Sequence, residues 1–355
     1  MLDLEPRPQK WFADKHRGAQ LPRSRRSGLA FAALGFWAGF GCFALVWGQS
    51  AAAPGDRPVR IGLLLYGSLQ QYGPEEHPFF TGLRDVGLSP GRNVTIVVRE
   101  AEGHVEQLRQ LAAELIAANP DIIVTAGPQP IQAVKDATSS IPIVMAIVSD
   151  PVTYGFAATL AHPGGNLTGM SMVNTELSSK RLELLKEAAP GRSRVAVFTD
   201  PTMGPQGLSE TEAAAPFLGL KLQIISVTAS HIDDGFAETE RGRAEALLVM
   251  PTPFYNLPEV RSRIGELALR QRLPSMCEEV SYVRAGCLLS YGPDFGQMWR
   301  RSAAYVDKIL RGASPGDLPI EQPTKFNLFV NLGIAKALGL EIPPSILARA
   351  GEVIE

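Results

Sequence analysis

The polar residues best suited to chemistry in this chain stand directly after apolar runs. The stretch 141–152 reads IPIVMAIVSDPV, so an unbroken apolar run ends in Ser149, Asp150 and Pro151. Such a run is typical of a strand buried on both faces, and proline ends it because it has no N–H for the ladder. Ligands bind at the carboxyl ends of strands in open α/β sheets. We therefore predict that Asp150 lies in a ligand cleft; the alternative is that it caps the next turn, as Asp before Pro often does.

Several other predicted strands end in small or polar residues. The residues that we predict to line the cleft all share this position: Ser68, Gly127, Gln129, Ser149, Asp150, Glu279, Ser290 and Tyr291. Amides at the start of the following helices can bind a carboxylate, Asp150 or Glu279 can bind an ammonium group, and Tyr291 can pack flat on a ring. A cap or turn role is the simpler explanation of any single one of them. Their joint placement at strand ends favours the cleft.

The residue types and spacings of a catalytic or metal centre are missing. Four histidines follow the N-terminal region, and none pairs with another at a metal-ligand spacing. The chain has no GxSxG elbow, no P-loop and no GxGxxG after its first predicted strand. Glu278 and Glu279 are adjacent, and in a strand they would point to opposite faces, which disfavours a paired acid–base role. We expect no enzymatic activity, no cofactor and no metal; an exported hydrolase is the disfavoured alternative.

Charge and cysteine content narrow the possible partners. Of 34 basic and 36 acidic residues, 7 and 3 precede Pro54, so 27 and 33 follow it, a net charge of −6. Nucleic-acid binding needs a basic excess, so we expect no nucleic-acid partner. Cys277 and Cys287 lie in predicted strands. They either pair in an oxidising compartment or remain two buried free thiols.

The elements that would position the cleft residues alternate between strand and helix. Strands are predicted at 59–67, 93–99, 121–125 and 141–148, with helices between them, and the alternation restarts at 176 after the turn cluster Pro163–Gly169. This pattern predicts an α/β fold of two doubly wound parallel-sheet lobes with a hinge and a ligand cleft between them. We assign residues 54–173 plus 291–319 to the first lobe and 174–290 plus 320–355 to the second.

The N-terminal residues 1–53 have the pattern of an export signal. A polar stretch ends in Arg23, Arg25 and Arg26, an uncharged apolar run extends from 28 to 47, and Ala51-x-Ala53 matches a signal-peptidase site. We therefore predict a periplasmic protein. The apolar run is about 20 residues long, which is enough to span a bilayer, so an uncleaved membrane anchor is the alternative.

Eight segments of the chain resemble those of a known family, the TrpX-like ABC-transporter substrate-binding proteins with the type I periplasmic-binding fold. They are IPIV at 141–144, DPV at 150–152, HPGGNLTG at 162–169, KRLELLKE at 180–187, LSYG at 289–292, YVDKILRG at 305–312, DLPIEQPTKF at 317–326 and AKALGLEIPPSILARA at 335–350. The resemblance runs from about residue 60 to the C-terminus. One departure is Pro251-Thr252-Pro253 in place of the family's usual PDP, which removes a carboxylate from a cleft edge.

The resemblance implies an extracytoplasmic receptor that delivers a small ligand to an ABC permease and its ATPase in the inner membrane. Its cleft positions correspond here to Ser68, Gly127, Gln129, Asp150 and Tyr291. The best-known ligands of the family are amino acids, especially aromatic ones. We thus expect a monomeric binding component of an importer for a small polar ligand, an amino acid or a related compound; the alternative is a membrane-tethered ligand-sensing module of the same fold.

Overall fold

The computed structural model describes residues 57–69, 77–172, 174–201 and 207–355. They belong to one compact unit, Pro54–Glu355. The predicted export signal or anchor at 1–53 lies outside the described residues. Among the described residues, no helix has the length and apolar character that crossing a membrane requires.

The first sheet is entirely parallel. Its strand order is β2-β1-β3-β4-β5. The strands are β1 (Val59–Leu65), β2 (Val94–Glu100), β3 (Ile122–Ala126), β4 (Ile143–Val148) and β5 (Leu167–Ser171). The first four confirm the predicted alternation, and their apolar runs are buried because helices cover both faces of the sheet.

Strand β5 corrects the interpretation of Pro163–Gly169 as turn alone, because the chain enters the sheet at Leu167. Gly169 makes this possible. Its φ is +139°, and a Cβ at this position would stand 2.1 Å from the carbonyl oxygen of Met145 on β4. Only glycine allows the two backbones to approach so closely in this conformation.

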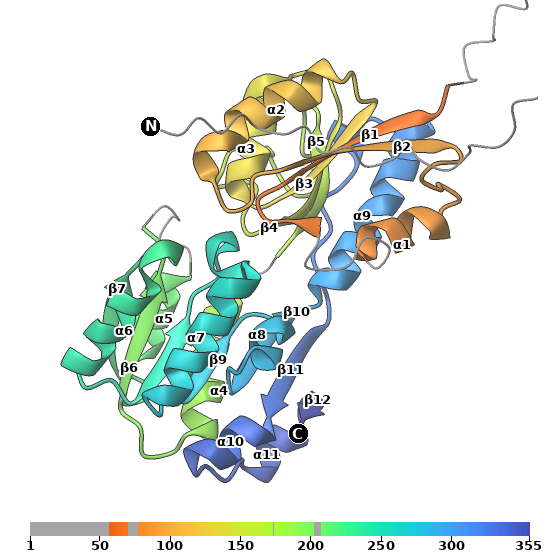
Figure 1. The fold of residues 1–355 in the computed structure, drawn as a ribbon. Helices are drawn as coiled ribbons and strands as arrows, with labels where there is room; N and C mark the ends of the chain where they lie inside the picture. Colours follow the sequence, from red (N-terminus) through yellow and green to blue (C-terminus); the bar gives the residue numbers. More distant parts are fainter. Residues whose placement is uncertain (1–56, 70–76, 173, 202–206) are drawn as a thin grey trace, which may run out of the picture. The chain divides into compact units, whose positions relative to one another are not determined.

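Two pairs of helices cover the first sheet (Figure 1). One face carries α2 (Leu108–Ala117) and α3 (Pro128–Ala137), and the other carries α1 (Pro78–Asp85) and α9 (Phe295–Leu310). Helix α9 comes from late in the chain, yet it packs on α1, β4 and β5. Asp294 caps it by accepting a hydrogen bond from the backbone N–H of Gln297 at 2.9 Å, which is a strong start signal for a helix.

The second sheet is parallel except for one pair of strands. Its order is β12-β11-β10-β9-β8-β6-β7, and β10 pairs with β11 antiparallel. The strands are β6 (Arg194–Thr199), β7 (Lys221–Ser226), β8 (Ala246–Val249), β9 (Ser275–Cys277), β10 (Leu289–Pro293), β11 (Phe326–Asn331) and β12 (Ala350–Ile354). We predicted a second sheet of the same type as the first, but β11 enters from the opposite direction, and β12 was not predicted.

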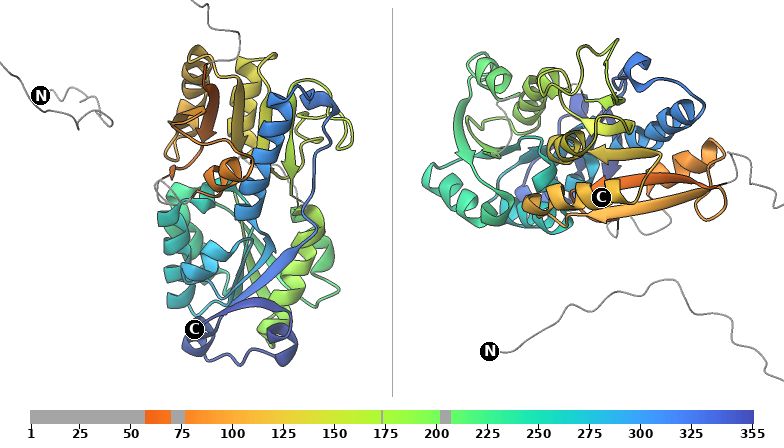
Figure 2. Two further views of the ribbon diagram at one scale, coloured as in Figure 1. Left: turned by 90° about the vertical axis from the view of Figure 1, so that its right-hand side faces the viewer. Right: turned by 90° about the horizontal axis from the view of Figure 1, so that it is seen from above.

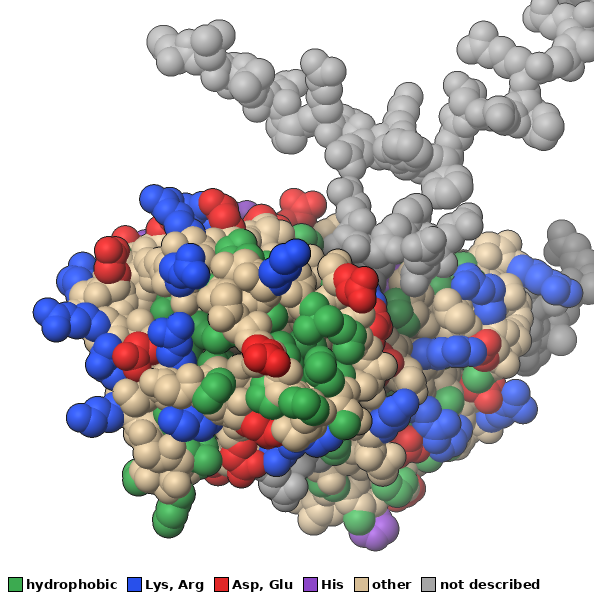
Figure 3. All heavy atoms as spheres, turned by 90° about the horizontal axis from the view of Figure 1, so that it is seen from below, with side chains coloured by type: hydrophobic (Ala, Val, Ile, Leu, Met, Phe, Trp, Pro, Cys, Tyr) green, Lys and Arg blue, Asp and Glu red, His purple; other side chains and the backbone are tan. Residues whose placement is uncertain are grey.

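Helices also cover the second sheet on both faces (Figure 2). They are α4 (Asn174–Ala188), α5 (Leu208–Ala214), α6 (Ile232–Arg241), α7 (Pro258–Arg270), α8 (Val280–Arg284), α10 (Leu332–Leu338) and α11 (Pro344–Leu347). Helix α4 lies against β8, β9 and β10, whereas α6 packs on β7 and α7. On the surface shown in Figure 3, acidic side chains are interspersed with basic ones.

The chain passes between the two sheets three times: from β5 to α4, from β10 to α9, and from residues 318–321 to β11. The third passage is hydrogen bonded to the end of β5, where the first passage begins. The N–H of Glu321 donates to the carbonyl of Gly169 at 3.0 Å, and the N–H of Ser171 donates to the carbonyl of Glu321 at 2.8 Å. Residues 291–293, which we assigned to the first lobe, still pair with β11 of the second sheet. The second passage therefore begins after residue 293. The lobe boundaries stay a prediction.

Gly82 offers a test of the packing between α1 and α9. A Cβ at this position would lie 2.2 Å from the carbonyl oxygen of Arg300. Helix propensity alone predicts that Gly82→Ala stabilises the protein by about 1 kcal/mol. We expect the opposite sign, a decrease of at least about 1 kcal/mol in the free energy of unfolding, because overpacking forces the two helices apart. Urea unfolding measures it.

The neighbouring variant Thr81→Ala is the matched control. Within the described part of the chain, its hydroxyl accepts a surface hydrogen bond from Arg84 and makes no other, so the change should stay within about 0.5 kcal/mol. A Gly82→Ala protein that is more stable than the wild type would contradict the close contact of α1 with α9.

Candidate functional site

A cavity of about 550 Å³ lies at the carboxyl ends of strands from both sheets. From the first sheet it is lined by residues that end or follow β1, β3 and β4: Leu65, Tyr66, Gly67, Ala126, Gly127, Pro128, Ile147, Val148 and Ser149. From the second sheet it is lined by residues that follow β8 and β9 or end β10: Pro251, Thr252, Pro253, Glu278, Glu279, Val280, Ser281, Gly292 and Pro293. The cavity therefore occupies the edge at which open α/β sheets bind ligands.

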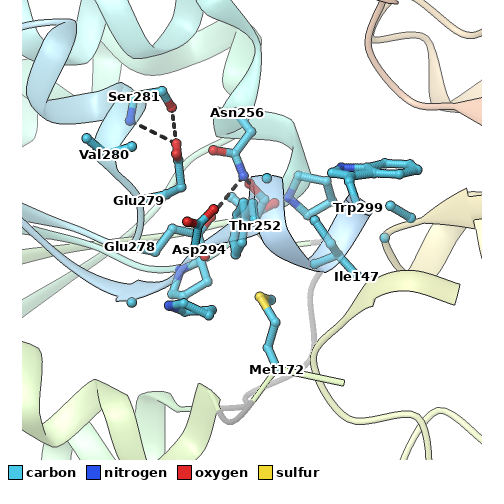
Figure 4. Close-up of a pocket in the computed structure, with 18 of the residues that line it drawn as sticks. Ile147, Met172, Thr252, Asn256, Glu278, Glu279, Val280, Ser281, Asp294 and Trp299 are labelled. Carbon is cyan, nitrogen blue, oxygen red and sulfur yellow. Dashed lines mark hydrogen bonds between the residues drawn. The ribbon is translucent and has the colours of Figure 1, made fainter. Parts of the chain in front are cut away.

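One wall of the cavity is apolar. Trp299 of α9 and Ile147 of β4 lie on the same side of it, and Met172 is also in the lining (Figure 4). The ring of His77 meets that of Trp299 edge to face, with centroids 4.9 Å apart. Burial lowers the pKa of His77 to about 4, so this imidazole is neutral near pH 7 and adds no charge to the wall.

The opposite wall carries a buried carboxylate. Glu278 follows β9 and is 3% exposed. The side-chain Nδ2 of Asn256, at the end of the short 3₁₀ helix η4 (Pro253–Asn256), donates to Glu278 Oε1 at 2.8 Å. The second carboxylate oxygen, Oε2, and the amide oxygen Oδ1 of Asn256 have no hydrogen-bond partner among the described residues.

Burial also sets the charge of this wall. It raises the pKa of Glu278 to about 7, against an opposing effect of Arg181 and of the Asn256 hydrogen bond. Arg181 of α4 is itself buried, and its Nε donates to the carbonyl of Tyr291 at 2.7 Å. Burial lowers the pKa of Arg181. The two opposite charges partly compensate each other, although no hydrogen bond joins them in the described part of the chain.

Two further arginines contribute positive charge to the lining. Arg261 of α7 donates from Nη1 to the carbonyl of Asn256 at 2.6 Å, which fixes its guanidinium beside the carboxylate wall. Nη2 of Arg284 on α8 lies 3.8 Å from Oε1 of Glu352 on β12. The cavity thus presents an apolar wall, the buried carboxyl of Glu278 and two guanidinium groups, together with the carboxylates of Glu279, Asp294 and Glu352.

Three of the predicted site residues line the cavity: Gly127, Ser149 and Glu279. Gly127 has φ +87° and precedes α3. The first turn of that helix contains Pro128 and Pro130, which have no N–H, so few amides remain there for a carboxylate. The carboxylate of Glu279 caps α8, because its Oε2 accepts from the N–H of Ser281 at 2.9 Å.

The other five predicted residues are not among the lining residues of this cavity. Ser68 donates to Glu100 at 3.0 Å, and Gln129 lies in the first turn of α3. Asp150 accepts hydrogen bonds from the N–H and the hydroxyl of Thr153 at 3.0 and 2.6 Å, which is the capping alternative. Ser290 is fully buried in β10, and Tyr291 packs against the core of the second sheet.

Sequence reasoning missed Glu278, Asn256 and Trp299. We extended the predicted strand to Glu279 and placed the two glutamates on opposite faces. Strand β9 instead ends at Cys277, so the chain turns and both side chains reach the cavity (Figure 4). A carboxylate directly after an apolar run was the available signal. The described residues contain no group of side chains that could hold a metal ion, and Cys277 and Cys287 are buried free thiols.

Comparison with known proteins places the chain in a family. Residues 76–354 match the model of the ABC transporter substrate binding proteins. The chain belongs to this family. The match confirms the resemblance, and the family is a class of binding proteins.

A curated relative is the tyrosine-binding protein of Clostridioides difficile (strain R20291). It is 24% identical over 290 residues, which are 75% of this chain and 79% of the relative.

Solved structures confirm the two-lobed fold. A conserved domain protein from Vibrio cholerae has a TM-score of 0.77 at 24% identity. An ABC domain from Streptococcus pneumoniae, in complex with L-Trp, has a TM-score of 0.75 at 23% identity. Each comparison covers 84% of this chain and 100% of the other.

The buried carboxyl of Glu278 predicts a pH dependence of stability. Its pKa is about 7 in the folded protein against 4.5 ordinarily, so the folded state holds the proton more tightly than the unfolded chain does. Stability from this group is present below pH 4.5 and is lost as the pH rises through 7. The wild type should lose on the order of 2 kcal/mol of stability from this group between pH 5 and pH 8, and Glu278→Gln should remove that loss. Urea unfolding of the ligand-free protein at both pH values measures this difference.

The pKa of His77 is lowered, so its effect has the opposite sign, but it is common to both proteins and cancels in the comparison. Glu183→Gln, at an exposed glutamate of α4, is the control and should follow the wild type. Parallel curves for Glu278→Gln and the wild type would contradict a raised pKa at this carboxyl.

Proposed function

We propose that this protein binds an aromatic amino acid in the cavity and serves as the binding component of an ABC importer. The observation that carries the proposal is the cavity itself, which joins an apolar wall to a charged one at the strand ends of both sheets. Its volume of about 550 Å³ lies within the usual range for small-molecule sites. An aromatic amino acid has the same division into an apolar ring and a charged end.

The lining offers a complement to each part of such a ligand. The ring of the ligand packs against Trp299 and Ile147, where aromatic contact and water exclusion favour it. The guanidinium groups of Arg261 and Arg284 attract its carboxylate. The tyrosine-binding relative and the L-Trp complex of the Streptococcus pneumoniae domain support this ligand class.

The transport role follows from the family and from the three passages between the sheets. Passages of this kind allow a hinge motion, and a ligand that contacts both walls stabilises the closed form. The closed form then docks on a permease and its ATPase in the inner membrane. In this proposal the protein is a periplasmic monomer exported by residues 1–53, and catalysis is not part of its function.

Calorimetric titration of the purified protein with L-Trp, L-Tyr, L-Asp and L-Lys tests the ligand class. We expect the aromatic pair to bind and the other two to bind at least tenfold more weakly. Ile147→Asp should weaken aromatic binding by more than tenfold, because it places a carboxylate against the ring of the ligand.

Val152→Asp makes the same chemical change at a position that is 42% exposed and outside the lining, and it should bind as the wild type does. Failure of the wild-type protein to bind either aromatic amino acid would refute the proposed ligand.

A further inference from the structure

Two buried hydrogen-bond acceptors belong to residues that line this cavity, and nothing in the described structure donates to them. They are Oε2 of Glu278 and Oδ1 of Asn256, and both residues are in the lining. The Nδ2 group of Asn256 donates to the other oxygen of Glu278 at 2.8 Å and to the carbonyl of Thr252 at 3.3 Å. Rotating the amide by 180° would set its oxygen against that carboxylate, so the orientation of Oδ1 is fixed.

A buried carboxylate oxygen without a donor is costly, because burial removes water and nothing replaces it. Arg181 does not supply the missing hydrogen bond. The Nη2 atom of Arg181 lies beside Gly292, since a Cβ built on that glycine would be 3.3 Å from it. The Nε of Arg181 donates to the carbonyl of Tyr291. Arg181 is not a lining residue; it reduces the electrostatic cost of a charged Glu278 from behind the wall.

The lining contains three more carboxylates, and each is already engaged. Asp294 caps α9, Glu279 caps α8, and Glu352 lies 3.8 Å from Arg284. Glu278 differs from them because it is almost fully buried and retains an oxygen that accepts no hydrogen bond from the described part of the chain. Its complement is a group with a positive charge and at least two N–H bonds, one for each acceptor.

We propose that Glu278 and Asn256 form the subsite for the ammonium group of the ligand. Glu278 Oε2 and Asn256 Oδ1 each accept one N–H from it, and the ring of the ligand points toward Trp299 and Ile147. This inference rests on the proposed function and adds to it the requirement for a primary amine, with the two residues that select it.

The test compares each amino acid with an analogue that lacks only the amino group. The full-length protein is titrated with L-Trp and with 3-(indol-3-yl)propanoate, and then with L-Tyr and 3-(4-hydroxyphenyl)propanoate. We expect the loss of the amino group to weaken binding roughly 30-fold or more, because one partner of a buried charged pair is removed. Glu278→Gln should weaken amino-acid binding by a similar factor and leave the binding of the deaminated analogues unchanged or stronger.

Asn256→Ala should weaken amino-acid binding by a smaller factor, since it removes an uncharged acceptor. Glu183→Gln is the matched control at an exposed glutamate and should not alter the affinity for the amino acid or for its analogue. Far-ultraviolet circular dichroism and the unfolding midpoint establish that each variant is folded.

The outcomes separate the two proposals. Equal affinities of the wild type for amino acid and analogue, or an equal loss of both in Glu278→Gln, overturn the ammonium subsite while aromatic binding stands. Absence of binding of all four compounds by the wild type overturns the proposed function, and the subsite with it. A loss confined to the amino acids in Glu278→Gln supports the assignment.

Discussion

The packing of α9 onto the first sheet is the constraint on which the rest of the molecule depends. The helix covers one face of that sheet together with α1, and Gly82 lets the two helices touch. The same helix contributes Trp299 to the apolar wall, and its capping residue Asp294 stands at the rim. Because α9 lies between β10 and β11 in sequence, its position obliges the chain to leave the second sheet and return. The second and third passages between the sheets are a consequence of this one packing arrangement.

The charged wall differs from the apolar one in its contribution to the stability of the fold. Burying a carboxylate and a guanidinium a short distance apart seldom stabilises a fold as well as apolar residues would. Glu278 and Arg181 are both buried, and neither is fully hydrogen bonded in the described structure. Such a pair stores unfavourable free energy that a suitable ligand can release. In the proposed function, stability and binding are therefore coupled at this wall, and the apolar wall supplies shape and water exclusion.

The sequence predicts the fold well because apolar runs reveal buried parallel strands regardless of what lies around them. It says less about which residues line the cavity, because a strand end is compatible with both a cap and a ligand contact. Asp150 illustrates this: its hydrogen bonds to Thr153 are local. Glu278 illustrates the reverse case. Strand β9 is shorter than predicted, so Glu278 follows the strand and lines the cavity instead of lying on a face of the sheet. Trp299 lies on a helix whose packing partner is more than 200 residues away, so its environment depends on tertiary structure.

The origin of α9 late in the chain also determines the order in which the molecule folds. The side chain of Arg300 on α9 donates to Asp85 on α1 at 2.6 Å, across 215 positions of sequence. During synthesis β1 to β5 emerge first, but the face that α1 and α9 cover stays only partly covered until α9 follows. Contacts between residues so far apart in sequence form slowly, because the entropy cost of closing a long loop comes before any stabilising contact. The first sheet, although it is N-terminal, is completed only after most of the second sheet has been made.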